Sequence, residues 1–179
     1  KSGLDRNVRF GVVGATAHFQ VGFDSSGDSP VAYGGHSAET INYVSCHDDL
    51  SLVDKLRASA PEGMTEEELV RFDKLAQTVV LTAQGIPSLF AGEEMLRTKG
   101  GVSNSHDSPD RVNRIDWSFK ADHKDVFDYY RGLIALRRTH PAFRLATAAE
   151  IERHLRFLDT GDTHVVAYML VDHAGDDPW

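Results

Sequence analysis

The stretch Ile41–Asp49 reads INYVSCHDD, and the rest of the chain is best understood by working outward from it. It opens as a short β-type run and closes on three side chains suited to chemistry, His47, Asp48 and Asp49. Side chains alternate between two faces along a strand, and consecutive residues can converge only where the strand stops. A buried strand that delivers a histidine and carboxylates at its carboxyl end is typical of active sites in parallel α/β folds. The stretch also fits a strand followed by an acidic turn that caps the next helix, and both interpretations stay open at this point.

A second β-type run follows after a helical segment. Thr65 and Glu68 stand at capping-box spacing, and apolar residues at three-and-four spacing extend the predicted helix to about Gln84. Gly85 ends this helix, and the glycine-bounded apolar run 86–92 predicts a buried strand. Strand, helix and strand therefore predict one β-α-β unit of a parallel sheet, with acidic residues after both strands.

The first 40 residues are the least regular part of the chain. Residues 8–14 resemble a glycine-interrupted strand or loop, and residues 24–30 and 33–37 have the composition of turns. The glycines within 8–14 miss the spacing of the dinucleotide-binding fingerprint, which argues against a nucleotide site. So long an irregular opening predicts that these residues have their packing partners elsewhere.

The second half of the chain predicts a polar loop, a helix and a hairpin. Residues 97–120 are polar, and a loop of this length after a strand is more often functional than idle. Asp122 is the predicted cap of a helix that Pro141 ends. Two β-type runs, 155–158 and 165–171, flank a turn and predict a β-hairpin.

Composition limits the classes of function. The chain has 179 residues, a formal charge of −8 and 41% hydrophobic residues, which is ordinary for a globular protein. An acidic balance without a Lys/Arg cluster argues against nucleic acid or a membrane surface as partner, and we expect no transmembrane segment or signal peptide within the chain. Cys46 is the single cysteine, so an internal disulfide is impossible, and we expect a buried, inert thiol. Oligomeric state and compartment, cytoplasmic or exported, stay open.

The residues around His47 fit three chemistries unequally. His47 and Asp48 match the adjacent metal-binding His-Asp pair of metal-dependent phosphohydrolases. A metal site needs three or more ligands, however, so we predict no metal and no cofactor. A Ser-His-Asp triad is disfavoured because no nucleophile-elbow sequence is present. Carboxylates after both strands, including Glu93 and Glu94, suit sugar chemistry, in which negative charge stabilises an oxocarbenium-like transition state. Trp117 in the polar loop offers an apolar surface for a sugar ring.

Several motifs together resemble type I pullulanases, debranching enzymes of the α-amylase superfamily of glycoside hydrolases. The motifs are INYVSCHDDLSLVDKL at 41–56, QGIP at 84–87, FAGEEMLRTKG at 90–100, Asn104-Ser105, Ser108-Pro109-Asp110 and VNRIDW at 112–117. The resemblance covers about residues 1–146, and it extends more weakly over residues 147–179. It implies an α-glucan as the partner of the site.

The resemblance also implies roles for single residues. Asp48 is the expected catalytic carboxylate, which stabilises the transition state, and His47 is expected to hydrogen-bond the same sugar. Asp110 and Asn113 are expected to line the substrate side. Asp49 stands where the family usually has Asn, which adds a charge beside Asp48.

The implied fold is the C-terminal part of a (β/α)8 TIM barrel, about strands 7–8 with their helices, followed by the start of an all-β sandwich domain. The expected boundaries are residues 1–146 for the barrel part and 147–179 for the β-sandwich. The implied function is that of a fragment of a retaining hydrolase that cleaves α-1,6 branch linkages in pullulan, glycogen or starch-derived glucans. Its nucleophile and general acid are expected upstream, so the chain alone is expected to be inactive. Isoamylase-like or α-1,4 specificity and a non-catalytic carbohydrate-binding role are the alternatives.

Overall fold

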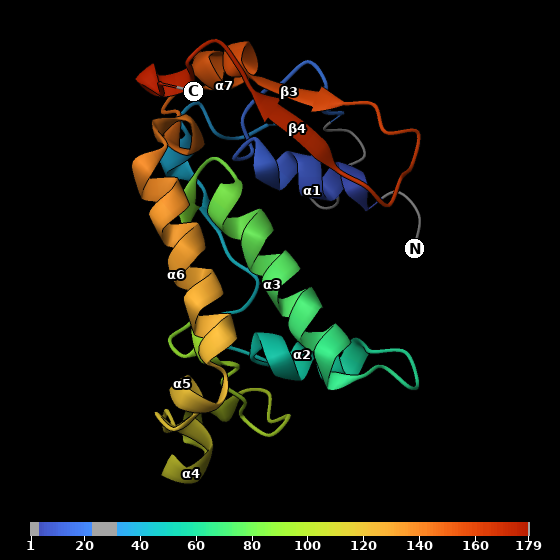
Figure 1. Ribbon diagram of the computed structural model, residues 1–179, viewed down its shortest axis with the longest axis vertical. Helices are drawn as coiled ribbons and strands as arrows, with labels where there is room; N and C mark the ends of the chain where they lie inside the picture. The colour runs from blue at the N-terminus through green and yellow to red at the C-terminus, as the bar shows by residue number, and fades with distance from the viewer. Residues whose placement is uncertain (1–3, 23–31, 179) are drawn as a thin grey trace. The chain divides into compact units, whose positions relative to one another are not determined.

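The computed structural model describes residues 4–22 and 32–178, which form two compact units (Figure 1). One unit combines residues 4–22, 32–42, 81–87 and 136–178, and the other combines residues 43–80 and 88–135. The turn expected over 24–30 lies outside the described residues. The expected domain boundary at 146/147 stays a prediction.

A parallel pair of strands confirms the predicted β-α-β connection. β1 (Ile41–Asn42) pairs in parallel with β2 (Ile86–Pro87), with Ile41 opposite Ile86. Both strands are shorter than predicted, since the first was expected to extend over residues 41–45 and the second over residues 86–92. Within the described residues this sheet consists of these two strands alone. The remaining residues of the predicted runs therefore have no neighbouring strand to pair with.

The second unit contains the helices α2 (Leu52–Ser59), most of α3 (Glu66–Thr82), α4 (Asp110–Asn113), α5 (Phe119–Asp122) and the first part of α6 (Lys124–Thr139). Helices α2, α3 and α6 pack around one hydrophobic cluster, whereas α4 and α5 bury no residue. The cluster consists of buried residues from four segments, namely Val53, Leu69, Leu96, Val126 and Tyr130. Asp122 ends α5 and does not cap α6 as predicted, because the helix breaks at His123 (φ −117°, ψ 42°).

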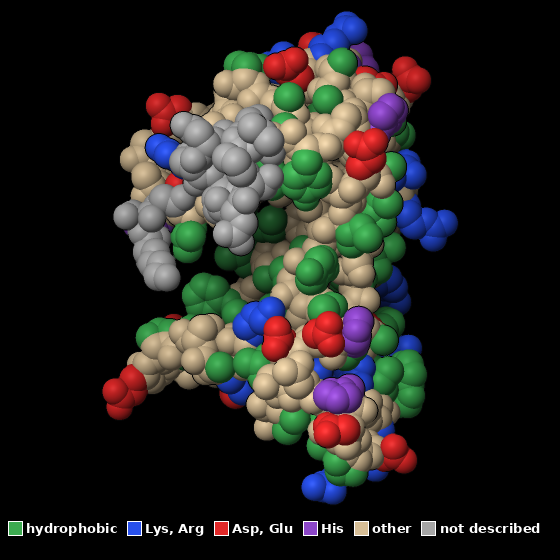
Figure 2. All heavy atoms as spheres, turned by 180° about the vertical axis from the view of Figure 1, so that it is seen from behind, with side chains coloured by type: hydrophobic (Ala, Val, Ile, Leu, Met, Phe, Trp, Pro, Cys, Tyr) green, Lys and Arg blue, Asp and Glu red, His purple; other side chains and the backbone are tan. Residues whose placement is uncertain are grey.

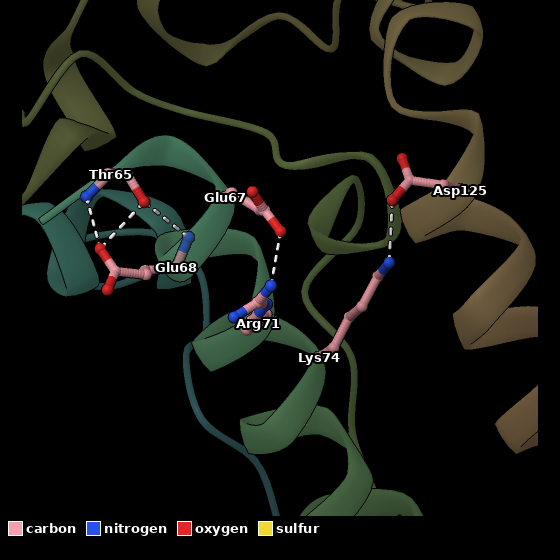
Figure 3. Close-up of polar contacts among 6 residues, drawn as sticks. All are labelled: Thr65, Glu67, Glu68, Arg71, Lys74 and Asp125. Carbon is pink, nitrogen blue, oxygen red and sulfur yellow. Dashed lines mark hydrogen bonds and ion pairs between the residues drawn. The ribbon is translucent and has the colours of Figure 1, made fainter.

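The start of α3 is the one predicted from sequence (Figure 3). The Glu68 side chain accepts hydrogen bonds from the Thr65 backbone N–H (2.8 Å) and hydroxyl (2.9 Å), and the Thr65 hydroxyl accepts from the Glu68 N–H (3.2 Å). Two ion pairs follow on the exposed side, from Arg71 to Glu67 and from Lys74 across to Asp125 on α6 at 2.8 Å. Local capping chemistry therefore sets where this helix begins.

The buried stripe of α3 differs from the apolar stripe predicted for it. Phe72 and Leu75 are 46% and 58% exposed, whereas the polar residues Asp73 and Gln77 are 1% and 0% exposed. They lie four residues apart, as does Leu69 from Asp73, so all three share one helix face. The polar pair Asp73 and Gln77 therefore lies on the buried face of α3.

The first unit contains two helices that the sequence analysis did not predict. Residues Asp5–Val12 form α1, not a strand or loop, and an Asp5–Arg9 ion pair of 3.7 Å lies along it. α7 (Ala148–His154) begins with a second capping box, between Thr147 and Glu150. The glycines near the first helix suggested a strand or loop, but Gly14 lies after its last turn with φ +65° and so ends it.

The predicted hairpin is confirmed at the C-terminal end. β3 (Leu155–Leu158) pairs antiparallel with β4 (Ala167–Leu170). The early residues find partners here: the Gln20 amide donates to the Phe157 carbonyl and accepts from the Phe157 N–H, each at 2.9 Å. Among the described helices, none is long and apolar enough to cross a membrane.

Candidate functional site

His47 and Asp48 lie side by side on the surface loop that follows β1. The His47 Nε2 and Asp48 Oδ1 atoms are 3.7 Å apart, and the two side chains are 85% and 71% exposed. Figure 2 shows histidine side chains with acidic side chains beside them on one exposed face. The pair predicted from sequence is therefore open to a ligand.

The neighbours of this pair shape the loop. Asp49 has φ +57°, a left-handed conformation that Asp and Asn tolerate better than most residues. Asp therefore suits a backbone position at which the resembled family usually has Asn. Cys46 is half-buried, not buried as expected, and its thiol lies 3.9 Å from the Asp48 carbonyl oxygen.

Lys99 holds the loop from the segment after β2. Its ammonium group donates to the His47 carbonyl at 3.0 Å and to the Ser105 hydroxyl at 3.1 Å, and the residue is only 3% exposed. A buried ammonium needs such partners, because an unpaired buried charge is costly. Lys99 thus ties the backbone that carries His47 to the polar loop.

Asn113 organises that polar loop. Its side-chain oxygen accepts from the Ser105 hydroxyl at 2.7 Å, and its side-chain nitrogen donates to the carbonyls of Ser105 (2.6 Å) and Ser108 (3.1 Å). Both hydrogens of the amide are used in this way. Asp110, at the start of α4, is exposed. Of the two predicted substrate residues in this loop, Asp110 is open to solvent and Asn113 is hydrogen-bonded within the loop.

Asp54 links α2 to the segment that contains Lys99. Its carboxylate accepts from the Thr98 hydroxyl, from the Lys99 N–H at 2.7 Å and from the Ser51 hydroxyl at 2.8 Å. Burial disfavours the charged form, but these hydrogen bonds outweigh burial and lower the pKa of Asp54. A cavity of about 360 Å³ opens beside this segment, with Arg111, Arg114 and Phe119 in its lining.

A buried carboxyl, Glu93, lies behind the His47–Asp48 loop. Its Oε1 accepts from the Ser45 hydroxyl, and its Oε2 accepts from the Gln77 amide at 2.8 Å and from the Phe90 N–H at 3.2 Å. Glu93 is 2% exposed, and burial raises its pKa to about 7, with a smaller contribution from the charge of Asp73. The sequence predicts Glu93 as a carboxylate after a strand that suits sugar chemistry, whereas in the structure its carboxyl is buried.

A second buried acid lies on the same face of α3. The Tyr130 hydroxyl donates to Asp73 Oδ1 at 2.7 Å, while Asp73 Oδ2 has no hydrogen-bond partner among the described residues. Burial raises the pKa of Asp73 to about 6 and also raises that of Tyr130. The sequence does not predict that Asp73 and Gln77 are buried, because the only signal is their four-residue spacing along α3 from Leu69. In the part of the chain that the structure describes, no group of three or more His, Cys, Asp or Glu is placed to hold a metal ion.

Comparisons with known proteins identify relatives of the whole arrangement. A family model described as the pullulanase all-beta domain matches residues 151–179. A pullulanase of Bacillus subtilis (strain 168) is 42% identical over 142 residues, which are 79% of this chain and 20% of that protein. An isoamylase of a Flavobacterium species is 35% identical over 68 residues, 38% of this chain and 9% of that protein.

Solved structures agree with these relatives. The crystal structure of a pullulanase from Paenibacillus barengoltzii, in complex with maltohexaose and α-cyclodextrin, superposes with a TM-score of 0.88 at 46% identity. The match covers 99% of this chain and 26% of that one. The chain thus spans about a fifth to a quarter of the length of the relatives it matches. Within that span, sequence and structure agree that this chain belongs to the pullulanase family of glycoside hydrolases.

Proposed function

We propose that the chain is part of a retaining enzyme that hydrolyses α-1,6-glucosidic branch linkages in pullulan, glycogen or starch-derived glucans. One observation carries this proposal: the exposed His47–Asp48 pair lies in a chain that aligns over 99% of its length with a pullulanase bound to maltohexaose and α-cyclodextrin. An α-glucan is therefore the proposed substrate.

The proposal includes the finer fold. Residues 1–146 are proposed as the C-terminal part of a (β/α)8 barrel, with β1 and β2 as strands seven and eight. The parallel pairing of β1 with β2 across α2 and α3 supports this assignment. Residues 147–179 are proposed as the beginning of a β-sandwich domain, supported by the β3–β4 hairpin and by the all-beta family model at 151–179.

In the proposed mechanism the carboxylate of Asp48 acts on the sugar at the cleavage point. Cleavage of the glycosidic bond develops positive charge on the sugar ring, and a fixed negative charge beside it lowers the barrier. His47 hydrogen-bonds the same sugar from the adjacent position. Lys99 holds the backbone under His47, so the sugar meets a site whose geometry is set in advance.

The polar loop completes the substrate side of the proposed site. Asp110 is proposed to accept hydrogen bonds from sugar hydroxyls, and its exposure to solvent supports this role. Asn113 contributes by fixing the Ser105–Ser108 turn that precedes Asp110. Trp117 is 66% exposed and offers an aromatic face for stacking on a sugar ring.

A retaining glycosidase also needs a nucleophile and a general acid. We place both in the portion of the relatives' length that this chain does not span, so the 179-residue chain is expected to be inactive. The test compares the purified chain with a protein extended to the length of its relatives, by measuring reducing ends released from pullulan. Turnover by the extended protein alone is the expected result, and turnover by the 179-residue chain would overturn this part of the proposal.

The isoamylase match over 68 residues supports a second specificity within the same chemistry. The extended protein should release oligosaccharides from pullulan and leave amylose, whose linkages are α-1,4, intact. Preference for amylose would replace the α-1,6 assignment by α-1,4 cleavage, and action on glycogen without action on pullulan would favour the isoamylase-like alternative. Binding of pullulan without turnover would replace the catalytic proposal by a carbohydrate-binding one.

A further inference from the structure

Glu93 joins two segments that the proposed mechanism uses but is not itself part of that mechanism. It follows β2 in the sequence, and its carboxyl reaches Ser45, which lies two residues before His47. Gly92 makes this reach possible: it has φ +99°, and a Cβ atom there would lie 2.8 Å from the Cβ of Arg97. The backbone is therefore built so that Glu93 points inward, beneath the loop of the candidate site.

A buried carboxyl in this position is expensive to ionise. Asp73 on α3 and Tyr130 on α6 face it together with Gln77, and the Asp73 charge opposes a charge on Glu93. The three donors to Glu93 favour the charged form, but they do not outweigh burial. Burial therefore favours the protonated form of the Glu93 carboxyl.

We propose that Glu93 is a positioning residue that, through its contact with the Ser45 hydroxyl, fixes Ser45 and with it the Ser45–Asp49 loop. Its catalytic consequence rests on the proposed function, whereas its effect on the loop does not. When the proton leaves, a loop opening that wets the carboxylate becomes more favourable, because the charge is better solvated in the open state. The closed loop thus holds His47 and Asp48 in place most firmly when Glu93 is protonated.

Cys46 is a built-in reporter of this loop, because it is half-buried, lies between Ser45 and His47 and is the single cysteine of the chain. The experiment measures alkylation of Cys46 by iodoacetamide in the 179-residue chain between pH 6 and pH 8, with circular dichroism to verify folding. Glu93→Gln cannot ionise but keeps a similar volume and hydrogen-bonding capacity. We expect equal rates for the two proteins at pH 6 and an about threefold or greater excess for the wild type at pH 8.

The sign of that difference separates positioning from a simple electrostatic effect. A nearby negative charge on Glu93 would disfavour the Cys46 thiolate and slow the wild type relative to Glu93→Gln. Glu94→Gln, next to Glu93, is the matched control and should follow the wild type at every pH. Ser45→Ala removes the hydroxyl and should raise the rate severalfold at both pH values.

Two results would overturn the inference. One is a wild-type rate at pH 8 equal to or below that of folded Glu93→Gln. The other, which decides the matter even where Glu93→Gln does not fold, is a wild-type rate for Ser45→Ala. In the extended protein, Glu93→Gln should move the alkaline limb of kcat to higher pH with little change in KM. The Cys46 rates decide the positioning role, and the pullulan assay separately decides the function.

Discussion

The two sides of the Ser45–Asp49 loop are built from opposite kinds of polar residue. On the outer side His47 and Asp48 are 85% and 71% exposed. On the inner side Ser45 and Glu93 are 3% and 2% exposed and bonded to each other. An exposed polar group keeps its hydrogen bonds to water and can contact a ligand, whereas a buried polar group destabilises the fold unless it is paired. The difference supports the proposal that the outer residues serve binding and chemistry, while the inner residues serve placement.

Helix α3 repeats the same contrast along its own length. Its first turn carries the exposed capping box of Thr65 and Glu68, and its middle carries the buried residues Asp73 and Gln77. Mutations of exposed residues should therefore have little effect on stability, although those of the His47–Asp48 pair should change activity. Mutations on the inner side should change stability and its dependence on pH.

The largest effect is expected from Asp48→Asn in the extended protein. This change removes a charge but not volume, so kcat should fall by about 10²- to 10³-fold, the range seen when one stabilising group at a developing charge is lost. The thermal midpoint should stay unchanged, because the side chain is exposed. Release of reducing ends from pullulan gives the first quantity, and calorimetry gives the second.

Asp49→Asn is the matched control for that variant. It also removes one negative charge from the loop, and Asn suits the left-handed backbone at this position. A near-wild-type rate is expected. A comparable loss of rate in both variants would show that charge in the loop matters in general, and it would remove the specific role of Asp48.

The second effect is a loss of stability as pH rises, caused by the buried acids. The pKa of Glu93 is raised from 4.5 to about 7 and that of Asp73 from 3.8 to about 6, so the folded chain binds protons that the unfolded chain has released. Stability from these groups is complete below their unfolded pKa values and is lost as pH rises through about 6 and 7. Each pKa unit corresponds to about 1.4 kcal/mol.

Urea unfolding at pH 5 and pH 8 measures this fall. Glu93→Gln should remove the part of the slope between pH 5 and 7 that belongs to Glu93, since its side chain does not titrate. Glu94→Gln should leave the slope as it is. Equal slopes for wild type and Glu93→Gln would mean that Glu93 ionises as easily in the folded chain as in the unfolded one.

Local signals in the sequence sufficed for part of this fold. The parallel β1–β2 pairing, the start of α3 at Thr65 and the β3–β4 hairpin all follow from caps, turns and periodicity, and the structure confirms them. The Thr147–Glu150 capping box is the same local signal as the one at Thr65, and it marks the start of α7, which is absent from the predicted elements. The helix of residues 5–12 was missed because its glycines suggested a strand or loop.

Tertiary information was needed for the rest. Phe72 and Leu75 fit an apolar stripe, whereas Gln77 is buried against Glu93 and Asp73 against the Tyr130 hydroxyl, contacts that the spacing does not reveal. The sequence predicts that His47 and Asp48 follow a strand end, and the structure has them exposed on the loop after β1; their role in a site stays a prediction. The hydrogen bonds of Lys99 and Asn113 join residues far apart in the chain, and no spacing reveals them.

The third effect tests a single buried hydrogen bond. Tyr130→Phe leaves the buried Asp73 carboxyl without its hydroxyl donor and should lower the free energy of unfolding by about 1–3 kcal/mol at neutral pH. The pKa of Asp73 should rise further, so the loss should shrink at pH 5. Tyr129→Phe is the control, since Tyr129 is 38% exposed and its hydroxyl lies 2.8 Å from that of Thr78. Equal losses in the two variants would contradict the special position of the inner side.

The smallest effect is expected at the exposed end of the same helix. Thr65→Ala removes a hydroxyl that accepts from the Glu68 N–H, and the loss of such a cap costs about 1 kcal/mol. Because water can replace the lost partner there, the cost should not depend on pH between 5 and 8, in contrast to that of Tyr130→Phe. Thr65→Ser keeps the hydroxyl and should restore most of the stability. If Thr65→Ala costs as much as Tyr130→Phe at neutral pH, exposure does not separate the two kinds of polar group in this helix, and the contrast between the two sides of the loop loses its support from α3.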